Sequence, residues 1–224
     1  CNVLVKMGAD ISGIGTDRII VRGVESLKGV EISNDPDRIE AGTFMIAGVL
    51  HPASELTLEG CNVDQLGNLP ELLSKTGAHV EIDGSTVKVK APKELEPVSI
   101  ATEVYPGFPT DMQAQWATML TQANGVSTVT DTVYYDRFSY VPELTRLGAD
   151  MRLEKNTVTI FGKTELEGAS VMSTDLRASV SLVLAAMVAE NKTEVLRIYH
   201  LDRGYENLEH KLNAVGAKIK RVDE

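Results

Sequence analysis

The sequence is poor in cysteine and in positive charge, and each scarcity excludes a class of protein. Its two cysteines, Cys1 and Cys61, are too few and too far apart for a disulfide framework, and no Cys/His cluster has the spacing of zinc ligands. A reducing cytoplasm is therefore the expected compartment. The formal net charge is −10, whereas a nucleic-acid surface needs clustered Lys and Arg. We expect no nucleic-acid partner, and any anionic ligand must be held by individually placed arginines.

Long apolar runs are also missing. The stretch VSLVLAAMVA at 180–189 falls well short of the roughly 20 residues that span a bilayer, so we expect no membrane segment. No charged segment followed by an apolar run opens the chain. Its first residue is Cys1 rather than Met, which suggests a fragment or a processed chain. The composition that remains, 43% hydrophobic and 24% charged over 224 residues, is typical of a globular protein with one large or two small cores.

One structural unit recurs along the chain, with a period of about 70 residues. The pair Gly-Ala closes a helical pattern four times, in MGA at 7–9, TGA at 76–78, LGA at 147–149 and VGA at 215–217. Each later unit opens on a short polar motif before an amphipathic helix, at Gly42-Thr43, Pro109-Thr110-Asp111 and Ser173-Thr174-Asp175. The chain therefore holds three full units after one partial unit.

The helix that opens each unit can be placed from its spacing. Thr110 and Gln113 are spaced as an N-terminal capping box, and apolar residues follow at helical intervals: Met112, Trp116, Met119, Leu120 and Ala123. We expect Trp116 in the core. In the third unit Thr174 is the expected cap, and in the first unit the helix is expected to start at Thr43 and to be shorter.

A β-rich stretch, a second helix and alternating strands follow each opening helix. HVEIDGSTVKVKA, at 79–91, has the clearest hairpin pattern, with Asp83-Gly84 at the turn. Three such units packed with their helices inward would share one core, which predicts a pseudo-threefold α/β domain over residues 36–224. Residues 1–35 hold the helix end and strands of an earlier unit, and we expect them to belong to a neighbouring, largely absent domain. The boundary is expected near Asn34-Asp35-Pro36.

Four motifs together resemble one family. They are FPTDMQAQW at 108–116, YDRFSYVPELTRLGA at 135–149, TDLRAS at 174–179 and HLDRGYE at 200–206. The chain resembles the UDP-N-acetylglucosamine 1-carboxyvinyltransferases of peptidoglycan synthesis, over essentially all 224 residues. The resemblance implies the two-domain, inside-out α/β barrel fold of the enolpyruvyl transferases, with substrates closed between the domains. This chain would supply nearly one whole domain.

The resemblance also implies an activity. Enolpyruvate would be transferred from phosphoenolpyruvate to the 3′-hydroxyl of UDP-N-acetylglucosamine through a tetrahedral ketal, with release of phosphate and without metal or organic cofactor. This is the first committed step of peptidoglycan synthesis. The family's Lys-Asn phosphoenolpyruvate motif and the loop with its Cys general acid would precede Cys1, whose surroundings resemble a helix before the domain crossing. We therefore expect Cys1 to be a buried helix residue, and the chain without the missing N-terminal half to be inactive.

Asp111 is the candidate catalytic base. Attack by a sugar hydroxyl on C2 of phosphoenolpyruvate needs a group that accepts the hydroxyl proton. A position in a first helical turn keeps a carboxylate ionised, which makes Asp111 a ready acceptor but a weak base whose contribution comes largely from positioning. Local sequence alone favours a simpler role, in which Asp111 complements the helix dipole. The family motif reverses that preference.

Arginines supply the candidate anion-binding groups. Arg177 falls in a first helical turn, where a cation opposes the dipole unless it binds an anion or pairs with Asp175. The resemblance places it at the active site. Arg203 precedes a helix, next to Gly204, and the resemblance implies a catalytic contact with the phosphoenolpyruvate carboxylate. Pairing of Arg203 with an acidic neighbour, Asp202 or Glu206, is the alternative.

Three further positions follow from the resemblance. Arg137 in YDRF matches an active-site arginine, and Val133 matches a position that touches UDP-N-acetylglucosamine through its backbone. Arg38 in PDRIE matches a residue at the domain crossing, where pairing with Glu40 is an equal alternative.

Two other functions compete with this reading. The first is the related 3-phosphoshikimate 1-carboxyvinyltransferase, which shares fold and donor, and the second is a non-catalytic domain fragment. Tyr135 stands where many relatives carry an acidic residue, and Tyr140 where many carry His. These departures weaken the transfer of fine substrate contacts and leave the family unchanged.

Overall fold

The computed structural model describes residues 1–222, which divide into two compact units with the division after Asp35. The first unit contains α1 (Asn2–Lys6) and the antiparallel strands β1 (Asp10–Ser12) and β2 (Ile20–Arg22). None of its residues is buried, and Cys1 is exposed just before α1, so the expectation of a buried Cys1 is wrong. Its assignment to a neighbouring domain stays a prediction.

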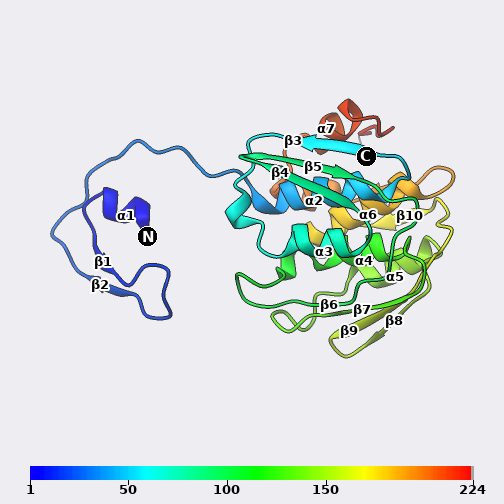
Figure 1. Ribbon diagram of the computed structural model, residues 1–224, viewed down its shortest axis with the longest axis horizontal. Coiled ribbons are helices and arrows are strands. Elements are labelled where there is room, and N and C mark those ends of the chain that lie inside the picture. The colour runs from blue at the N-terminus through cyan, green and yellow to red at the C-terminus, as the bar shows by residue number, and fades with distance from the viewer. Residues whose placement is uncertain (223–224) are drawn as a thin grey trace. The chain divides into compact units, whose positions relative to one another are not determined.

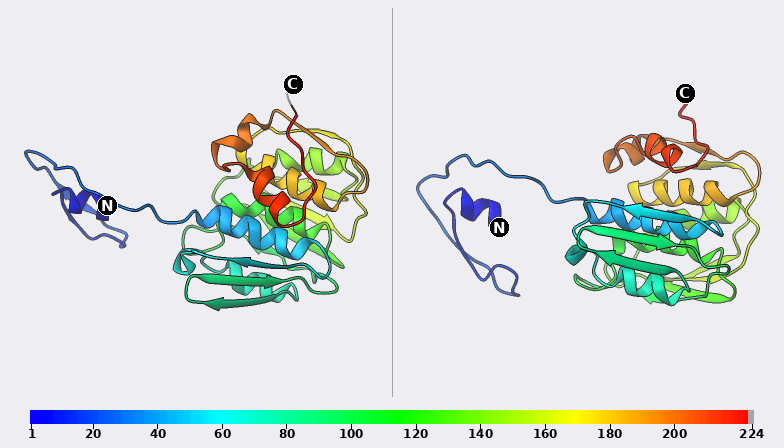
Figure 2. Two further views of the ribbon diagram at one scale, coloured as in Figure 1. Left: turned by 90° about the horizontal axis from the view of Figure 1, so that it is seen from above. Right: turned by 45° about the horizontal axis from the view of Figure 1, so that its top comes forward.

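Three helices form the centre of the second unit, one from each repeat. They lie side by side in the interior in Figure 1 and in the two views of Figure 2: α2 (Arg38–Leu50), α4 (Gln113–Leu120) and α6 (Leu176–Val188). Every residue of α4 is buried, including Trp116, as expected. One cluster of buried apolar side chains draws on all three repeats, which confirms the shared, helix-inward core.

Three sheets lie around this helical centre. Two of them are seen on opposite sides of the helices in Figure 1. The first has the order β3-β5-β4 and is antiparallel throughout: β3 (Glu55–Leu58), β5 (Thr86–Lys90) and β4 (His79–Asp83). The second has the order β6-β7-β9-β8, with only β6 and β7 parallel: β6 (Ile100–Ala101), β7 (Val126–Thr130), β9 (Thr157–Phe161) and β8 (Met151–Glu154). The third pairs β10 (Ser170–Met172) with β11 (Glu194–Leu196) in parallel.

The Gly-Ala pairs that mark the repeat stop helices. The second helix of each unit ends just before one: α3 (Leu69–Lys75), α5 (Tyr140–Arg146) and α7 (Leu208–Ala214). The glycine of each of the four pairs has a positive φ, between 88° and 106°. This left-handed conformation after a helix favours glycine because it has no Cβ to clash. The repeat signal in the sequence is therefore a helix-ending signal.

The predicted hairpin is confirmed. Asp83 pairs with Thr86, so the turn consists of Gly84 and Ser85, one residue later than expected. Gly84 has a φ of 56°, which a tight hairpin turn requires.

The predicted start of the first central helix is wrong. α2 begins at Arg38 and has 13 residues, as many as α6, whereas α4 has 8. The Asp37 carboxylate caps α2 by accepting the N–H groups of Ile39 and Glu40. Gly42 does not open the helix. It lies inside it where a Cβ would come within 2.8 Å of Leu69, so it permits close packing.

The predicted caps of the other two central helices are also wrong. Asp175, rather than Thr174, caps α6 by accepting the N–H groups of Arg177 and Ala178. α4 has no side-chain cap and is preceded by the 3₁₀ turn η2 (Thr110–Met112). The side chains expected to form its capping box bond to Asp131 instead. Two further 3₁₀ segments are η1 (Val63–Gln65) and η3 (Ile198–Arg203).

Across residues 1–222, the helices are all too short or too polar to cross a membrane.

Candidate active site

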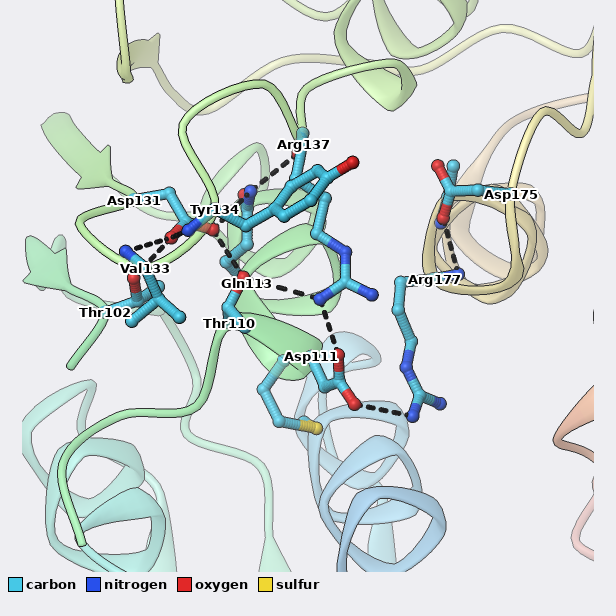
Figure 3. Close-up of polar contacts among 12 residues, drawn as sticks. Thr102, Thr110, Asp111, Gln113, Asp131, Val133, Tyr134, Arg137, Asp175 and Arg177 are labelled. Carbon is cyan, nitrogen blue, oxygen red and sulfur yellow. Dashed lines mark hydrogen bonds and ion pairs between the residues drawn. The ribbon is translucent and has the colours of Figure 1, made fainter. Parts of the chain in front are cut away.

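Asp111 lies between two arginines that reach it from separate parts of the fold. Its Oδ1 accepts from Arg137 Nη1 at 2.5 Å and its Oδ2 from Arg177 Nη2 at 2.8 Å (Figure 3). Asp111 is in η2, Arg137 in the loop between β7 and α5, and Arg177 in the first turn of α6. The structure thus brings together three of the predicted site residues, from the second and third repeats.

The two arginines keep Asp111 ionised. Burial alone would raise the pKa of Asp111, but the hydrogen bonds and charges of Arg177 and Arg137 lower it below its ordinary value. The low pKa was expected, but its cause differs, because Asp111 precedes α4 and lies between two guanidinium groups. The Asp111 side chain keeps about a third of its surface exposed (35%), so its carboxylate is accessible to a ligand.

Arg177 does not form the ion pair with Asp175 that the sequence left open. The Asp175 carboxylate accepts the N–H of Arg177 at 2.8 Å and the hydroxyl of Ser139 at 2.6 Å. The Arg177 side chain, 11% exposed, extends to Asp111 and lies over the ring of Tyr205, 5.9 Å from its centroid. Its Nε is buried without a hydrogen-bond partner among the described residues. Burial by itself would lower the pKa of Arg177, but the Asp111 contact raises it above its usual value.

A small polar cluster lies beside Arg177, where side chains from the three repeats meet. The hydroxyls of Thr43 in α2 and Tyr205, which follows η3, are 2.8 Å apart. Gln115 in α4 donates from Nε2 to Thr43 Oγ1 at 3.3 Å. Tyr205 also lies 3.4 Å from Arg177 Nη1. Burial raises the pKa of Tyr205, which keeps the phenol neutral. Sequence reasoning assigned Thr43, Gln115 and Tyr205 no role in the site.

A second polar network surrounds Asp131, directly after β7. This carboxylate is fully buried and accepts hydrogen bonds from five groups: Thr102 Oγ1, Thr110 Oγ1, Gln113 Nε2, Val133 N and Tyr134 N (Figure 3). Burial would raise the pKa of Asp131, but hydrogen bonds from Thr102, Thr110 and the backbone lower it. Asp131 was missed because an acidic residue after a strand is typical of an exposed loop.

Val133 lies in the loop that follows this carboxylate. It is 42% exposed, and with Glu103, Val104 and Thr132 it lines an open depression in the surface. Because Val133 follows β7 and is exposed, it can contact a ligand, whereas a residue buried inside the strand could not.

Among the described residues, Arg38 and Arg203 form no ion pair with Asp111. Arg38 is the first residue of α2, and its guanidinium lies over the ring of Tyr105, 5.5 Å from the centroid. Glu40 pairs instead with Lys211, at 2.5 Å. Arg203 ends η3 and is exposed.

One of the two acidic neighbours that could have paired with Arg203 has another partner. Asp202 bonds to Arg221 at 2.6 Å. A Cβ at Gly204 would come within 2.8 Å of Leu176, so Gly204 permits close packing against α6. Within residues 1–222, no group of three or more His, Cys, Asp or Glu side chains is placed to hold a metal ion.

This geometry can bind an anion and accept a proton at neighbouring positions. Two guanidinium groups form paired, charge-assisted hydrogen bonds with carboxylates and phosphates. An accessible ionised carboxylate between them can accept a hydrogen bond or a proton from a hydroxyl.

Comparison with known proteins decides the family. Residues 1–212 match the family model described as EPSP synthase (3-phosphoshikimate 1-carboxyvinyltransferase). The chain belongs to the EPSP synthase family. It is similar to the UDP-N-acetylglucosamine 1-carboxyvinyltransferase of Chlorobaculum parvum, with 50% identity over 221 residues, 99% of this chain and 52% of that protein. The protein of that name from Koribacter versatilis is 48% identical over 223 residues, 100% of this chain and 51% of its own. The predicted resemblance is confirmed, and the chain spans about half the length of these relatives.

Two solved structures support the fold. The enolpyruvyl transferase NikO from Streptomyces tendae is 30% identical, with a TM-score of 0.87 over 98% of this chain and 52% of that one. EPSP synthase from Acinetobacter baumannii is 18% identical, with a TM-score of 0.74 over 99% of this chain and 54% of its own. The second likeness concerns the fold alone. The predicted α/β enolpyruvyl transferase fold is confirmed.

Proposed function

We propose that this chain forms the Asp111-bearing half of an enzyme that transfers enolpyruvate from phosphoenolpyruvate to the 3′-hydroxyl of UDP-N-acetylglucosamine. The observation that carries the proposal is the Asp111 carboxylate between Arg137 and Arg177. The name shared by relatives 47–50% identical to the chain supports the choice of acceptor. In the cell this would be the first committed step of peptidoglycan synthesis, carried out in the cytoplasm.

In the proposed reaction, Asp111 accepts the proton of the attacking hydroxyl. The hydroxyl oxygen bonds to C2 of phosphoenolpyruvate while C3 takes up a proton from an acid in the missing half, which gives a tetrahedral ketal. Loss of a C3 proton and cleavage of the bond from C2 to the phosphate oxygen then release phosphate. Because its low pKa makes Asp111 a weak base, proton transfer to it belongs late in the attack, and correct placement supplies much of its effect.

The arginines have complementary roles in this proposal. Arg137 and Arg177 exchange their contacts with Asp111 for contacts with substrate anions, and the exposed Arg203 binds the phosphoenolpyruvate carboxylate. Arg38 contributes at the domain crossing. Val133 meets UDP-N-acetylglucosamine through its carbonyl oxygen, because its N–H already donates to Asp131.

The related reaction with shikimate 3-phosphate as acceptor is the second candidate. It shares the donor and the fold, but its structural neighbour is only 18% identical. We also propose that the 224-residue chain is inactive by itself, because half of each relative's length is absent and one wall of a two-walled pocket buries too little of a ligand.

The test is phosphate release by the longer protein that contains this chain. Phosphate release is expected when phosphoenolpyruvate and UDP-N-acetylglucosamine are both present. No release is expected with either substrate alone, or when shikimate 3-phosphate replaces UDP-N-acetylglucosamine as the acceptor. Asp111→Asn should lower kcat by about 10²–10⁴-fold, the usual contribution of a general base. Asp83→Asn, at the exposed β4–β5 hairpin, is the matched control and should retain full activity. Full activity of Asp111→Asn would exclude the proposed base.

A further inference from the structure

The reaction as proposed gives the buried carboxylate of Asp131 no role. Its two oxygens divide their hydrogen bonds between two regions. Oδ1 accepts from Thr102 Oγ1 at 2.6 Å and from the N–H groups of Val133 and Tyr134 at 2.9 and 2.8 Å. Oδ2 accepts from Thr110 Oγ1 at 2.5 Å and from Gln113 Nε2 at 3.2 Å. Asp131 therefore ties the start of the Arg137 loop to the turn that carries Asp111.

The two side chains on Oδ2 also contact Arg137. Arg137 Nη1 lies 3.4 Å from Thr110 Oγ1, and Gln113 Nε2 donates to the Arg137 carbonyl oxygen at 2.6 Å. Thr110 precedes Asp111 in the chain and shares η2 with it. One side of Asp131 thus contacts residues that hold both members of the Asp111–Arg137 ion pair.

Among the described residues, the Asp131 carboxylate accepts from hydroxyl, amide and backbone N–H groups and forms no ion pair with a cation. A buried carboxylate satisfied by neutral donors from several segments fixes those segments in one arrangement, since a lost partner leaves a costly unpaired group. The structure holds this arrangement next to the site, where an error of about 1 Å costs about a hundredfold in rate.

We propose that Asp131 is a positioning residue that holds Arg137 against Asp111. Its Oδ2 orients Thr110 and Gln113, and its Oδ1 orders the first residues of the loop that leads to Arg137. The consequence for catalysis rests on the proposed function, whereas the positioning itself can be tested without turnover.

Positioning and simple charge removal have opposite effects on Asp111. If Asp131 only contributed a negative charge nearby, removing that charge would lower the pKa of Asp111, because a like charge disfavours ionisation. If Asp131 holds Arg137 in place, its removal weakens the contact of Asp111 with a cation and the pKa of Asp111 rises. The sign of the change separates the two roles.

The experiment is a titration of the Asp111 carboxyl carbon by NMR in the 224-residue chain, assigned by comparison with Asp111→Asn. In Asp131→Asn the pKa of Asp111 should rise by on the order of one unit, the lower end of the effect of an adjacent cation. Asp83→Asn should leave it unchanged. An unchanged or lowered pKa in a folded Asp131→Asn protein would overturn the proposal.

A matched pair of milder variants covers the case in which Asp131→Asn does not fold. Thr110→Val and Thr102→Val each remove one hydroxyl donor to Asp131, on opposite oxygens, and only Thr110 also contacts Arg137. Thr110→Val should raise the pKa of Asp111 clearly more than Thr102→Val does, because only Thr110 also contacts Arg137. Equal shifts, or none in either variant, would reject positioning. Because no substrate is used, a failed transfer assay with the expected pKa shift would reject the proposed function and leave this inference standing.

Discussion

At the scale of single residues, three aspartate carboxylates in and around the site make the free energy of unfolding depend on pH. The pKa values of Asp111, Asp131 and Asp175 all lie below the ordinary value in the folded protein. A group whose pKa is lower in the folded state than in the unfolded chain stabilises the fold above its unfolded pKa. That contribution is lost as the pH falls through the folded pKa. We therefore expect the free energy of unfolding to decrease below about pH 4, where unfolded aspartates take up protons.

Asp131→Asn provides the test of this pH dependence. At pH 7 the variant should be less stable by about 1.5–3 kcal/mol, the usual contribution of a hydrogen bond to a charged group. The difference should shrink between about pH 4 and pH 2, because the parent carboxylate is then protonated as well. Urea unfolding at a series of pH values measures both. Two stability curves that stay parallel down to pH 2 would show that ionised Asp131 does not stabilise the fold.

Residue roles show where sequence reasoning was limited. Asp111, Arg137 and Arg177 could be named from motifs, and the structure places them in contact. Asp131 could not, because its side-chain donors come from chain segments about 20 to 30 residues away and leave no local spacing signal. The polar cluster beside Arg177 was missed for the same reason, since Thr43 and Tyr205 are far apart in sequence.

At the scale of elements, helix ends were predicted better than helix starts. A left-handed glycine after a helix is a one-residue requirement that sequence shows directly, as at Gly77 and Gly148. An N-cap can be supplied by any of several neighbouring polar residues, and only the backbone conformation decides between them. The N-cap of α6 is Asp175, one residue beyond the predicted Thr174.

The caps of α2 and α6 allow a matched comparison. Asp37→Ala should cost about 1 kcal/mol, because Asp37 accepts only backbone N–H groups at the start of α2. Asp175→Ala should cost more, about 2 kcal/mol, since Asp175 also accepts from Ser139. Urea unfolding at pH 7 gives both values. Equal losses would show that the Ser139 contact adds no stability.

At the scale of the whole molecule, the two units differ in what they bury. One apolar cluster serves all three repeats, and Leu184 in α6 is fully buried within it. Leu184→Ala should lower the free energy of unfolding by about 2–5 kcal/mol, through lost burial and the cavity left behind. Because the core is shared, Trp116 fluorescence and far-UV circular dichroism should shift together. Separate transitions for the two signals would show that the repeats unfold independently.

Residues 1–35 provide the internal control for that experiment. None of them is buried, so their amide hydrogens should exchange rapidly in both the parent and the Leu184→Ala protein. The amide hydrogens of α4, in the core, should exchange faster in the Leu184→Ala protein than in the parent protein. Slow amide exchange in residues 1–35 of the parent protein that becomes faster in the Leu184→Ala protein would show that these residues unfold together with the core, and would contradict the division into two units.

The contact of Asp111 with Arg177 joins the second repeat to the third. An anion that replaces the carboxylate between the arginines would bridge parts of the chain that are adjacent only when the repeats are fully packed. Such a ligand binds the native state and not the unfolded chain, so by mass action it raises the melting temperature as its concentration rises. Binding of an anion at this small site would therefore stabilise the entire three-repeat domain. A thermal shift titration would measure the affinity of the ligand without any catalytic turnover.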